Sequence, residues 1–336
     1  MNVNHSRKSK DLHQEIERMC ETCGNIMVHV AGKNYDPTHT TTLRNMMVRE
    51  SNRRFNTIAR AIQIAVEEED VFGLNNISVM QQTPGKNVYA YLTDSGKITE
   101  FLNWLDTLIA EDILEVQGIP QGVNTHQWLY KYLQDAYQRG VVRARDELRR
   151  AGYDVPTIAA SGGIPIVMFV PVHVETVAFM YTRTYNDLKG VTDAMRQNIA
   201  RVLSEGLMSG KNPRRIAREL VAVINGSGED LGLVDKLGRY IPARRRAEIL
   251  VRTEIIRAHH LANINEYRMW GAYGVNVKAE WSTAGDDRVC MQCASLQGQI
   301  FTLDDIETMI PYHPQCRCVA LPIPVDSKGQ RIDYGF

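Results

Sequence analysis

The sequence lacks the segments that direct a chain into or across a membrane. Its first residues contain no apolar stretch of the kind that secretory signals carry, so we expect no signal peptide. The most apolar run extends from Ile164 to Val172 and includes two prolines; it has nine residues, whereas a membrane span takes about 20. We therefore expect no stable association with a membrane, and we expect cysteines that stay reduced.

Signatures of common enzyme families are also missing. The sequence has no Walker A loop, no GxGxxG after a strand, no GxSxG elbow and no HExxH pair. No set of nucleophile, base and acid stands out, so we expect a protein that is not an enzyme. Lys plus Arg and Asp plus Glu both number 39. This balance gives the chain no overall attraction to nucleic acid, although a local patch could still bind it.

What the sequence does contain is long amphipathic periodicity. Apolar residues make up 44% and charged residues 23%, which is typical of a folded chain. We predict a mainly α protein of long helices with a small α+β Cys/His-rich C-terminal module. Apolar side chains recur at helical spacing, as one buried face requires; they are Leu43, Met47, Phe55, Ile58, Ile62 and Val66, then Phe101, Leu105 and Ile109, then Trp128, Tyr132 and Ala136, and finally Ala247, Val251, Ile255, Ala258, Ala262 and Met269.

The predicted segments follow from these helices and from the Pro- and Gly-rich breaks between them. We expect an N-terminal helical domain at 1–153, an apolar linker or strand at 154–172, a second helical domain at 173–275, and the Cys/His-rich module with its tail at 276–336. Within these segments we expect helices at 1–24, 96–117, 125–151, 173–188 and 190–209, a hairpin or loop at 72–92, a helix capped by Asn212 with a loop after it, and a long helix after Pro242.

The apolar run from Ile164 to Val172 has two interpretations. We interpret it as a buried strand or a packed interdomain segment. The alternative is an exposed apolar loop that inserts into a partner, because exposed apolar patches usually mark contacts.

Four of the six cysteines gather with a histidine near the C-terminal end. Cys290 and Cys293 form a C-x2-C pair, and His313, Cys316 and Cys318 follow after 19 residues. Two close pairs of soft ligands joined by a loop are the pattern that a tetrahedral Zn²⁺ site requires. We therefore predict a structural zinc ion held by Cys290, Cys293, His313 and Cys316, with Cys318 as the alternative ligand.

Other states of these thiols stay open. A disulfide could join the two close pairs, or all four thiols could be free. A catalytic metal is less favoured than a structural one, because a shell made almost entirely of thiolates leaves no position for water. Cys20 and Cys23 form a separate CxxC, which is a weak redox signal without a strand before it.

A polar stripe is expected on the last long helix. Arg252, Ile256, His259, Asn263 and Glu266 are three or four residues apart and so share one face. This stripe is either a buried polar network that links the helix to the cysteine module or a solvated face.

Roughly residues 185–323 carry motifs in a specific order and spacing. They are Arg252, Thr253 and Glu254, then Trp281, Asp287, Arg288, Cys290, Cys293, Gly298 and Phe301, then Pro311, His313, Pro314, Cys316, Arg317 and Cys318. In these residues the chain resembles the phage head morphogenesis family, the minor head proteins related to phage Mu protein F and the phage SPP1 minor head protein. The family often has Asn near the position of His260, so no role is carried over to that residue.

The resemblance implies a minor virion component of a tailed bacteriophage. Such proteins are present in few copies, associate with the portal and other head proteins, and act in head morphogenesis, DNA packaging or DNA delivery. It further implies a location in the virion head near the portal vertex, with the host cytoplasm as the site of assembly and packaged DNA as a further partner. The residues to which it gives structural or interaction roles are Arg252, Thr253, Glu254, Trp281, Asp287, Arg288 and Arg317.

A rival hypothesis assigns the same module to nucleic acid. In it, the chain is a zinc-dependent nucleic-acid-binding or nuclease-like module, with Arg288, Arg317 and His313 near the metal. The balanced overall charge argues against this hypothesis.

Overall fold

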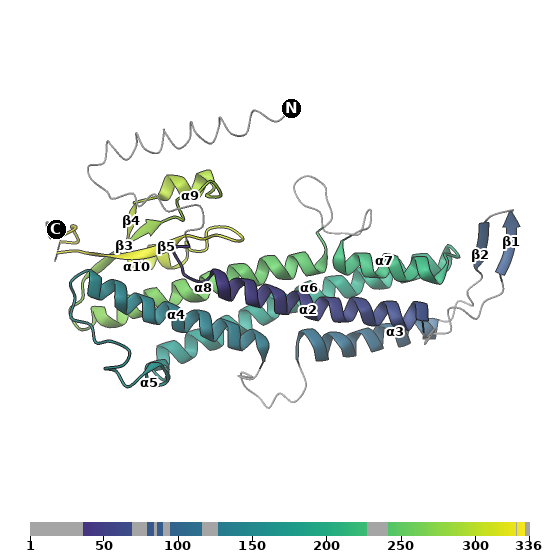
Figure 1. The fold of residues 1–336 in the computed structure, drawn as a ribbon, viewed down its shortest axis with the longest axis horizontal. Helices are drawn as coiled ribbons and strands as arrows, with labels where there is room; N and C mark the ends of the chain where they lie inside the picture. Colours follow the sequence, from purple (N-terminus) through teal and green to yellow (C-terminus); the bar gives the residue numbers. More distant parts are fainter. Residues whose placement is uncertain are drawn as a thin grey trace. The chain divides into compact units, whose positions relative to one another are not determined.

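The computed structural model describes residues 36–68, 79–83, 86–89, 95–115, 127–226, 241–326 and 328–332. Within these residues the structure is mainly helical, and a small three-stranded sheet lies near the C-terminal end (Figure 1). This arrangement confirms the predicted fold class. The predicted helix that would carry Cys20 and Cys23 and the predicted loop after the Asn212-capped helix lie outside the described residues.

The chain divides into two compact units, and each unit is assembled from separate stretches of sequence. Of the described residues, unit 1 contains those up to Thr41, those in Ala136–Val174 and those from Ile256 onward. Unit 2 contains those in Thr42–Asp135 and Glu175–Ile255. The four segments proposed from the sequence stay a prediction.

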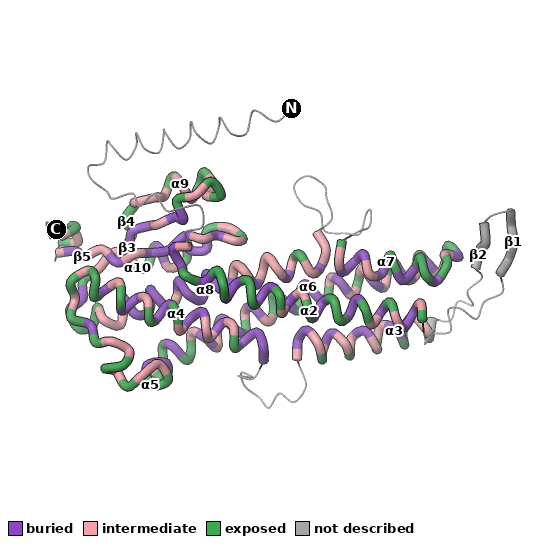
Figure 2. Tube along the Cα trace, in the orientation of Figure 1, coloured by how far each residue is buried: buried purple, intermediate pink, exposed green. Residues whose placement is uncertain are grey.

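Unit 2 is built largely from helices whose apolar faces the sequence predicted. Buried positions recur along these helices, as the purple segments of Figure 2 show. All six predicted core residues between Leu43 and Val66 are buried, and so are the three between Phe101 and Ile109. Its elements include α2 (Thr41–Gln63), the π-helical turn η1 (Ile64–Glu68), an antiparallel hairpin of β1 (Val79–Thr83) and β2 (Lys86–Tyr89), α3 (Ser95–Leu108), the π-helical turn η2 (Ile109–Ile113) and α7 (Pro213–Asn225).

Helix α7 begins where the sequence predicts it. The Oδ1 atom of Asn212 accepts a hydrogen bond from the backbone N–H of Arg214 at 2.8 Å, and Pro213 occupies the first helical position. An Asn N-cap of this kind stabilises a helix by about 1 kcal/mol. The helix ends at Gly226, whose left-handed φ of 86° lets its N–H donate to the carbonyl of Ala222.

Three long helices carry the chain through both units. They are α4 (Trp128–Arg150), α6 (Pro171–Met208) and α8 (Ala243–Gly271), and the division between the units falls within each of them. Helix α8 starts directly after Pro242, as predicted. Its five predicted core residues from Ala247 to Ala262 are buried, whereas Met269 is half-buried. On α4, Trp128 and Ala136 are buried and Tyr132 is half-buried.

The prediction of two helices over 173–188 and 190–209 is wrong, because α6 is a single helix of 38 residues. Gly190 lies at the position of the predicted break. A glycine inside a helix costs only about 1 kcal/mol relative to alanine, and it keeps the backbone N–H that the helix needs. Gly190 lies on the exposed side of α6 and is accommodated without a break.

The interpretation of the apolar run as a buried strand is also wrong. Residues Ile164–Met168 form a short helix, α5, and the chain then turns directly into α6. Pro165 and Pro171 lie in the first turns of these two helices, where a missing N–H costs nothing, whereas either would interrupt a strand within a sheet. Much of the run is exposed, including Phe169 at 80%.

The C-terminal module of unit 1 is a small sheet covered by short helices. The strand order is β4–β3–β5, and both pairings are antiparallel. Its core contains Trp281, Ala279, Ile306 and Ile310, all buried. The two prolines of β5 fit an edge strand, where fewer N–H donors are needed. The elements are β3 (Val277–Ser282), α9 (Met291–Leu296), β4 (Ile300–Phe301), α10 (Leu303–Glu307) and β5 (Val319–Pro324).

Among the described helices, none combines the length and the apolar character that a membrane span demands.

Candidate metal centre

The four C-terminal cysteines are brought together by the start of α9 and by the approach to β5. Cys290 is the N-cap residue of α9, and its Sγ accepts a hydrogen bond from the backbone N–H of Cys293 at 3.3 Å. This cap draws both thiols onto the first turn of the helix. Cys316 and Cys318 lie in the segment that leads into β5, which pairs with β3.

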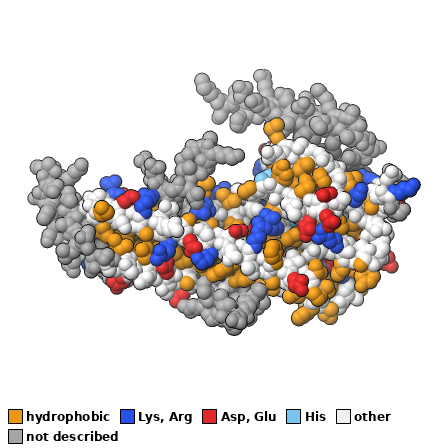
Figure 3. All heavy atoms as spheres, turned by 180° about the vertical axis from the view of Figure 1, so that it is seen from behind, with side chains coloured by type: hydrophobic (Ala, Val, Ile, Leu, Met, Phe, Trp, Pro, Cys, Tyr) orange, Lys and Arg blue, Asp and Glu red, His pale blue; other side chains and the backbone are white. Residues whose placement is uncertain are grey.

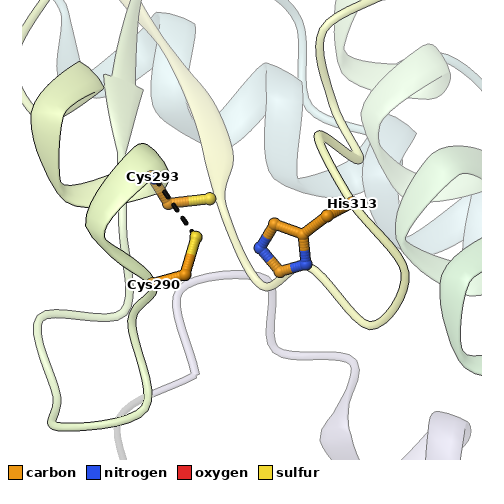
Figure 4. A group of neighbouring side chains, drawn as sticks. All are labelled: Cys290, Cys293 and His313. Atoms are coloured by element: carbon orange, nitrogen blue, oxygen red, sulfur yellow. Dashed lines mark hydrogen bonds between the residues drawn. The ribbon is translucent and has the colours of Figure 1, made fainter. Parts of the chain in front are cut away.

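The ligand atoms of these residues form two overlapping groups. In the first, the sulfurs of Cys290 and Cys293 and a ring nitrogen of His313 all lie within 4.8 Å of one another. Figure 4 shows the imidazole facing the two sulfurs from the loop that follows α10. In the second, the sulfurs of Cys293, Cys316 and Cys318 satisfy the same limit. Cys293 belongs to both groups, so the two groups share one sulfur and lie next to each other.

The hydrogen bond of His313 fixes which ring nitrogen can bind a metal. Its Nδ1 atom lies 2.8 Å from the backbone carbonyl of Pro314. A carbonyl oxygen only accepts, so Nδ1 carries the proton and Nε2 keeps its lone pair. Metal-binding histidines commonly use this arrangement, because the bond orients the ring and sets its tautomer.

The thiols differ in the ease with which they ionise. Hydrogen bonds from the thiol and backbone N–H of Cys318 lower the pKa of Cys316 to about 5. As the donor of that bond, Cys318 has a raised pKa. Burial raises the pKa of Cys293 to about 12. Because these thiols are buried, ionisation of a second and a third thiol is unfavourable in the absence of a cation. A bound divalent cation would remove this penalty.

An ion cluster holds the two cysteine segments in register. Arg317, between Cys316 and Cys318, donates from Nη1 and Nη2 to the two carboxylate oxygens of Asp286, at 2.7 and 2.5 Å. The same carboxylate accepts from the backbone N–H, Nε and Nη2 of Arg288. The bond from Arg317, followed by those from Arg288, holds the pKa of Asp286 far below its usual range.

This cluster weakens the nucleic-acid hypothesis. Arg288 and Arg317, which that hypothesis places near the metal in a nucleic-acid-binding module, both already bind one carboxylate. The sequence pointed to Asp287 in this stretch, but Asp287 is exposed and the neighbouring Asp286 binds both arginines. The spacing of the residues alone could not show which of the two adjacent carboxylates binds the arginines.

Trp281 supports the centre from β3. Its side chain is fully buried, and its ring meets Tyr312 edge-on with centroids 6.0 Å apart. Its backbone N–H donates to the carbonyl of Gln299, and its own carbonyl accepts from Gly298. The tryptophan thus joins the loop after α9 to the sheet.

The other residues that the resemblance singled out lie elsewhere. Arg252, Thr253 and Glu254 belong to unit 2. Arg252 pairs with Glu248 at 3.1 Å, one turn earlier on α8. Glu254 is buried and lies 3.5 Å from the hydroxyl of Thr184 on α6. Thr253 donates to the carbonyl of Ile249 on the same helix, so of these three it is Glu254 whose described contact reaches another helix.

The polar stripe of α8 is buried over most of its length, but it is not one continuous network: among the described residues, Nε2 of His259 and the side-chain amide of Asn263 make no hydrogen bond. His259, Asn263 and Glu266 are each at most 1% exposed, whereas Arg252 is half-buried.

One link from α8 to the cysteine module is made by His260, whose Nε2 lies 3.0 Å from the carbonyl of Ile306 on α10. Another is made by Arg268, which pairs with Asp304 and Glu307 of α10. Burial lowers the pKa of His260 to about 4, so its ring is neutral at pH 7. No spacing rule pointed to this residue.

Glu266, at the end of the stripe, is the centre of a buried network with residues of other helices. It accepts from Nε of Arg145 on α4 at 2.9 Å and from Nε1 of Trp270 at 2.9 Å, and Nε2 of His173 lies 3.1 Å away. Burial alone would raise the pKa of Glu266, but the contacts with His173 and Arg145 bring it below its usual value. Tyr137 extends this buried network, because its hydroxyl lies 2.9 Å from Nδ1 of His173.

The donor set fits a soft divalent cation. Three of the four thiols are buried, the fourth is half-buried, and the available imidazole nitrogen faces two of them. A thiolate-rich tetrahedral shell of this composition is typical of structural zinc sites. Within the described residues, the chain therefore presents Cys/His groups that can hold a metal ion in a mainly helical protein.

Comparison with known protein families gives a match to part of this chain. Residues 197–321 match the family described as Phage Mu protein F like protein. The matched residues include all five candidate ligands, and the match confirms the resemblance seen in the motifs. No curated protein and no solved structure matches the chain.

Proposed function

We propose that this chain is a minor head protein of a tailed bacteriophage. The observation that carries the proposal is the match of residues 197–321 to a phage family, over a stretch that contains the complete Cys/His set. The proposed role is structural: the protein associates with the portal and other head proteins during head morphogenesis, DNA packaging or DNA delivery. It is present in few copies near the portal vertex of the virion, after assembly in the host cytoplasm.

The proposed cofactor is one structural Zn²⁺ ion. Cys290, Cys293 and His313 supply three ligands, and Cys316 is the fourth, with Cys318 beside it as the alternative. When bound, the ion joins the start of α9 to the approach to β5. A module of this size buries little apolar area, so such a crosslink matters; structural zinc contributes about 10–16 kcal/mol in small peptides.

A structural role agrees with the chemistry of the ligands. A four-coordinate shell of thiolates and one imidazole has no position for water or substrate, and water at the metal is what catalytic zinc requires. We therefore propose that the module provides a fixed surface for docking and carries out no reaction.

The experiment that tests the proposal is separation of the phage into heads and tails. We expect quantitative mass spectrometry to find this chain in purified heads, at far fewer copies than the major head protein, and cryo-EM to place it beside the portal. Recovery only in tails, or in neither fraction, would contradict the proposal.

A further inference from the structure

The cysteine module contains one more candidate ligand than a tetrahedral zinc ion binds. In the proposed set of four ligands, Cys318 is the thiol left over. It is 4% exposed and directly precedes β5, whose pairing with β3 fixes the backbone at this point. Its sulfur lies within 4.8 Å of that of Cys293. A buried surplus thiol this close to a ligand thiol is placed for disulfide formation.

Cys293 is the sulfur that the two groups of candidate ligands share. It lies within 4.8 Å of the sulfur of Cys290 in one group and of the sulfur of Cys318 in the other. Among the described residues, no such group contains both Cys290 and Cys318, so a route between them passes through Cys293. A disulfide bond is about 2.05 Å long, so the sulfurs of each pair must approach by roughly 3 Å or less.

Access from solvent differs among the four thiols. Cys290 is half-buried, whereas Cys293, Cys316 and Cys318 are at most 4% exposed. An oxidant therefore reaches Cys290 first. Hydrophobic side chains gather over the C-terminal module on the face drawn in Figure 3, and Met291, beside Cys290, is 75% exposed. A small uncharged oxidant such as hydrogen peroxide approaches this surface without losing the hydration of a charge.

We propose that the site is a redox switch, in which oxidation replaces the zinc crosslink by a disulfide between Cys293 and Cys318. The inference rests on the proposed function and concerns the regulation of its metal site. In the reducing host cytoplasm, where the head is assembled, the thiols bind zinc. A released virion meets an oxidising medium. There the disulfide joins the same two segments, the start of α9 and the approach to β5, without a metal.

The first step consumes one molecule of hydrogen peroxide. The thiolate of Cys290 attacks one peroxide oxygen, the O–O bond breaks, and the sulfur becomes a sulfenic acid as hydroxide leaves. The thiolate of Cys293 then attacks that sulfur, so that an S–S bond forms, the S–O bond breaks and a second hydroxide leaves. Each hydroxide takes a proton from the solvent. Two thiolates are thereby oxidised, the peroxide is reduced to two molecules of water, and the loss of two ligands releases zinc.

The second step is a thiol–disulfide exchange without net oxidation. Cys318 loses its proton and attacks the sulfur of Cys293, the bond between Cys293 and Cys290 breaks, and Cys290 takes up the proton. The pair of Arg317 with Asp286 holds the two segments together after zinc has left. The exchange therefore releases the more exposed thiol and leaves a buried disulfide that crosslinks the module.

The test uses the full-length chain, purified with zinc under reducing conditions and then treated with hydrogen peroxide after removal of the reductant. A chromogenic chelator measures the zinc released, mass spectrometry maps the disulfides, and limited proteolysis reports on the module. We expect the wild type to release about one zinc ion per chain, to form the disulfide between Cys293 and Cys318, and to stay resistant to protease. Cys318→Ser should bind zinc like the wild type. Its oxidation should stop at the disulfide between Cys290 and Cys293, and its module should then be cleaved roughly tenfold faster than that of the oxidised wild type.

Two controls exclude other oxidisable groups. Cys20→Ser with Cys23→Ser removes the two thiols that lie outside the module, and Met291→Leu removes the exposed thioether beside Cys290. Both variants should release zinc and form the disulfide between Cys293 and Cys318 as the wild type does.

Three results would overturn the inference. The first is Cys318→Ser that purifies without zinc, because Cys318 would then be a ligand and no longer surplus. The second is a disulfide between Cys316 and Cys318, or between Cys293 and Cys316, in place of the proposed one. The third is equal proteolysis of the oxidised variant and the oxidised wild type.

The failure of the proposed function gives a different result. If the reduced wild type holds no zinc, the proposed cofactor is wrong, and peroxide should still produce the disulfide between Cys293 and Cys318 in the metal-free chain; its absence there also overturns the inference. If the chain is not found in phage heads, the proposed function fails, and a disulfide exchange measured in the purified chain is unaffected.

Discussion

Arg317 donates two hydrogen bonds to Asp286 across 31 residues of sequence, and this pair joins the segments that carry the two cysteine pairs. The carboxylate side chain is only 3% exposed and that of the arginine 15%. Such a pair restricts the relative movement of the two segments before any metal binds. It therefore provides a preformed framework for the ligands.

Replacement of Asp286 by Asn should show how much the ion pair with Arg317 stabilises the protein, apart from any contribution of a metal. The variant keeps the shape of the side chain but leaves Arg317 without its charged partner. We expect a loss of about 1.5–3 kcal/mol in the free energy of unfolding, the range for hydrogen bonds to charged groups. Urea denaturation at pH 7 measures it. Asp287→Asn, one residue later and exposed, is the control and should cost less than about 0.5 kcal/mol.

A stronger loss is expected from Glu266→Gln. This substitution leaves Arg145 buried without a countercharge and also weakens the contact with His173. Breaking a buried pair from one side costs about 3–5 kcal/mol. The control is Glu205→Gln, whose exposed pairing with Arg201 is worth less than about 1 kcal/mol. Equal midpoints in urea for the two variants would show that the buried network does not stabilise unit 1.

The pH dependence of stability should reveal the buried histidines. Burial lowers the pKa of His260 to about 4, whereas an unfolded histidine titrates near 6.5. The unfolded chain therefore binds more protons between these values, and the stability that is present above pH 6.5 is lost as the pH falls toward 4. We expect His260→Gln, whose Nε2 can still donate to the carbonyl of Ile306, to flatten this decline. Parallel curves for the variant and the wild type between pH 7 and 4 would contradict the assignment.

Two glycines should respond oppositely to alanine. A Cβ on Gly140 of α4 would lie 2.4 Å from the backbone oxygen of His259 and 2.6 Å from the Cβ of Ala262, whereas a Cβ on Gly190 meets nothing within 4 Å. Gly190→Ala should stabilise the protein by about 0.5–1 kcal/mol through helix propensity. Gly140→Ala should destabilise it by about 1–3 kcal/mol because the helix backbones must separate. Thermal unfolding of the two variants distinguishes them, and a gain in both would show that α4 and α8 pack more loosely.

Much of the fold could be predicted from the sequence because apolar side chains recur at helical spacing. That pattern placed α2, α3, α4 and α8 and their buried faces, and the Asn212–Pro213 pair placed the start of α7. It failed near residue 189, where the predicted break between two helices is absent and α6 continues through Gly190. It also failed at Ile164–Val172, because apolar composition indicates burial only where a partner is present.

The sequence predicted the types of the candidate ligands and their spacing, but it did not predict the tertiary contacts around them. The gathering of Cys290, Cys293 and His313 follows from a short helix and a returning loop, which the C-x2-C pattern indicates. The pairing of Asp286 with Arg317 and the contact from His260 to α10 are different in kind, since they depend on tertiary packing and have no local signal. The contacts of Glu266 with Arg145 and His173 could not be predicted from the sequence for the same reason.

The content of zinc in the purified protein tests the account most directly. The protein should be purified under reducing conditions and its metals measured by elemental analysis, alongside Cys290→Ser and Cys316→Ser. We predict about one zinc ion per wild-type chain and a large loss of zinc in both variants, with earlier proteolysis of the C-terminal module. Metal near zero in the reduced wild type, with the module still resistant to protease, would contradict the account.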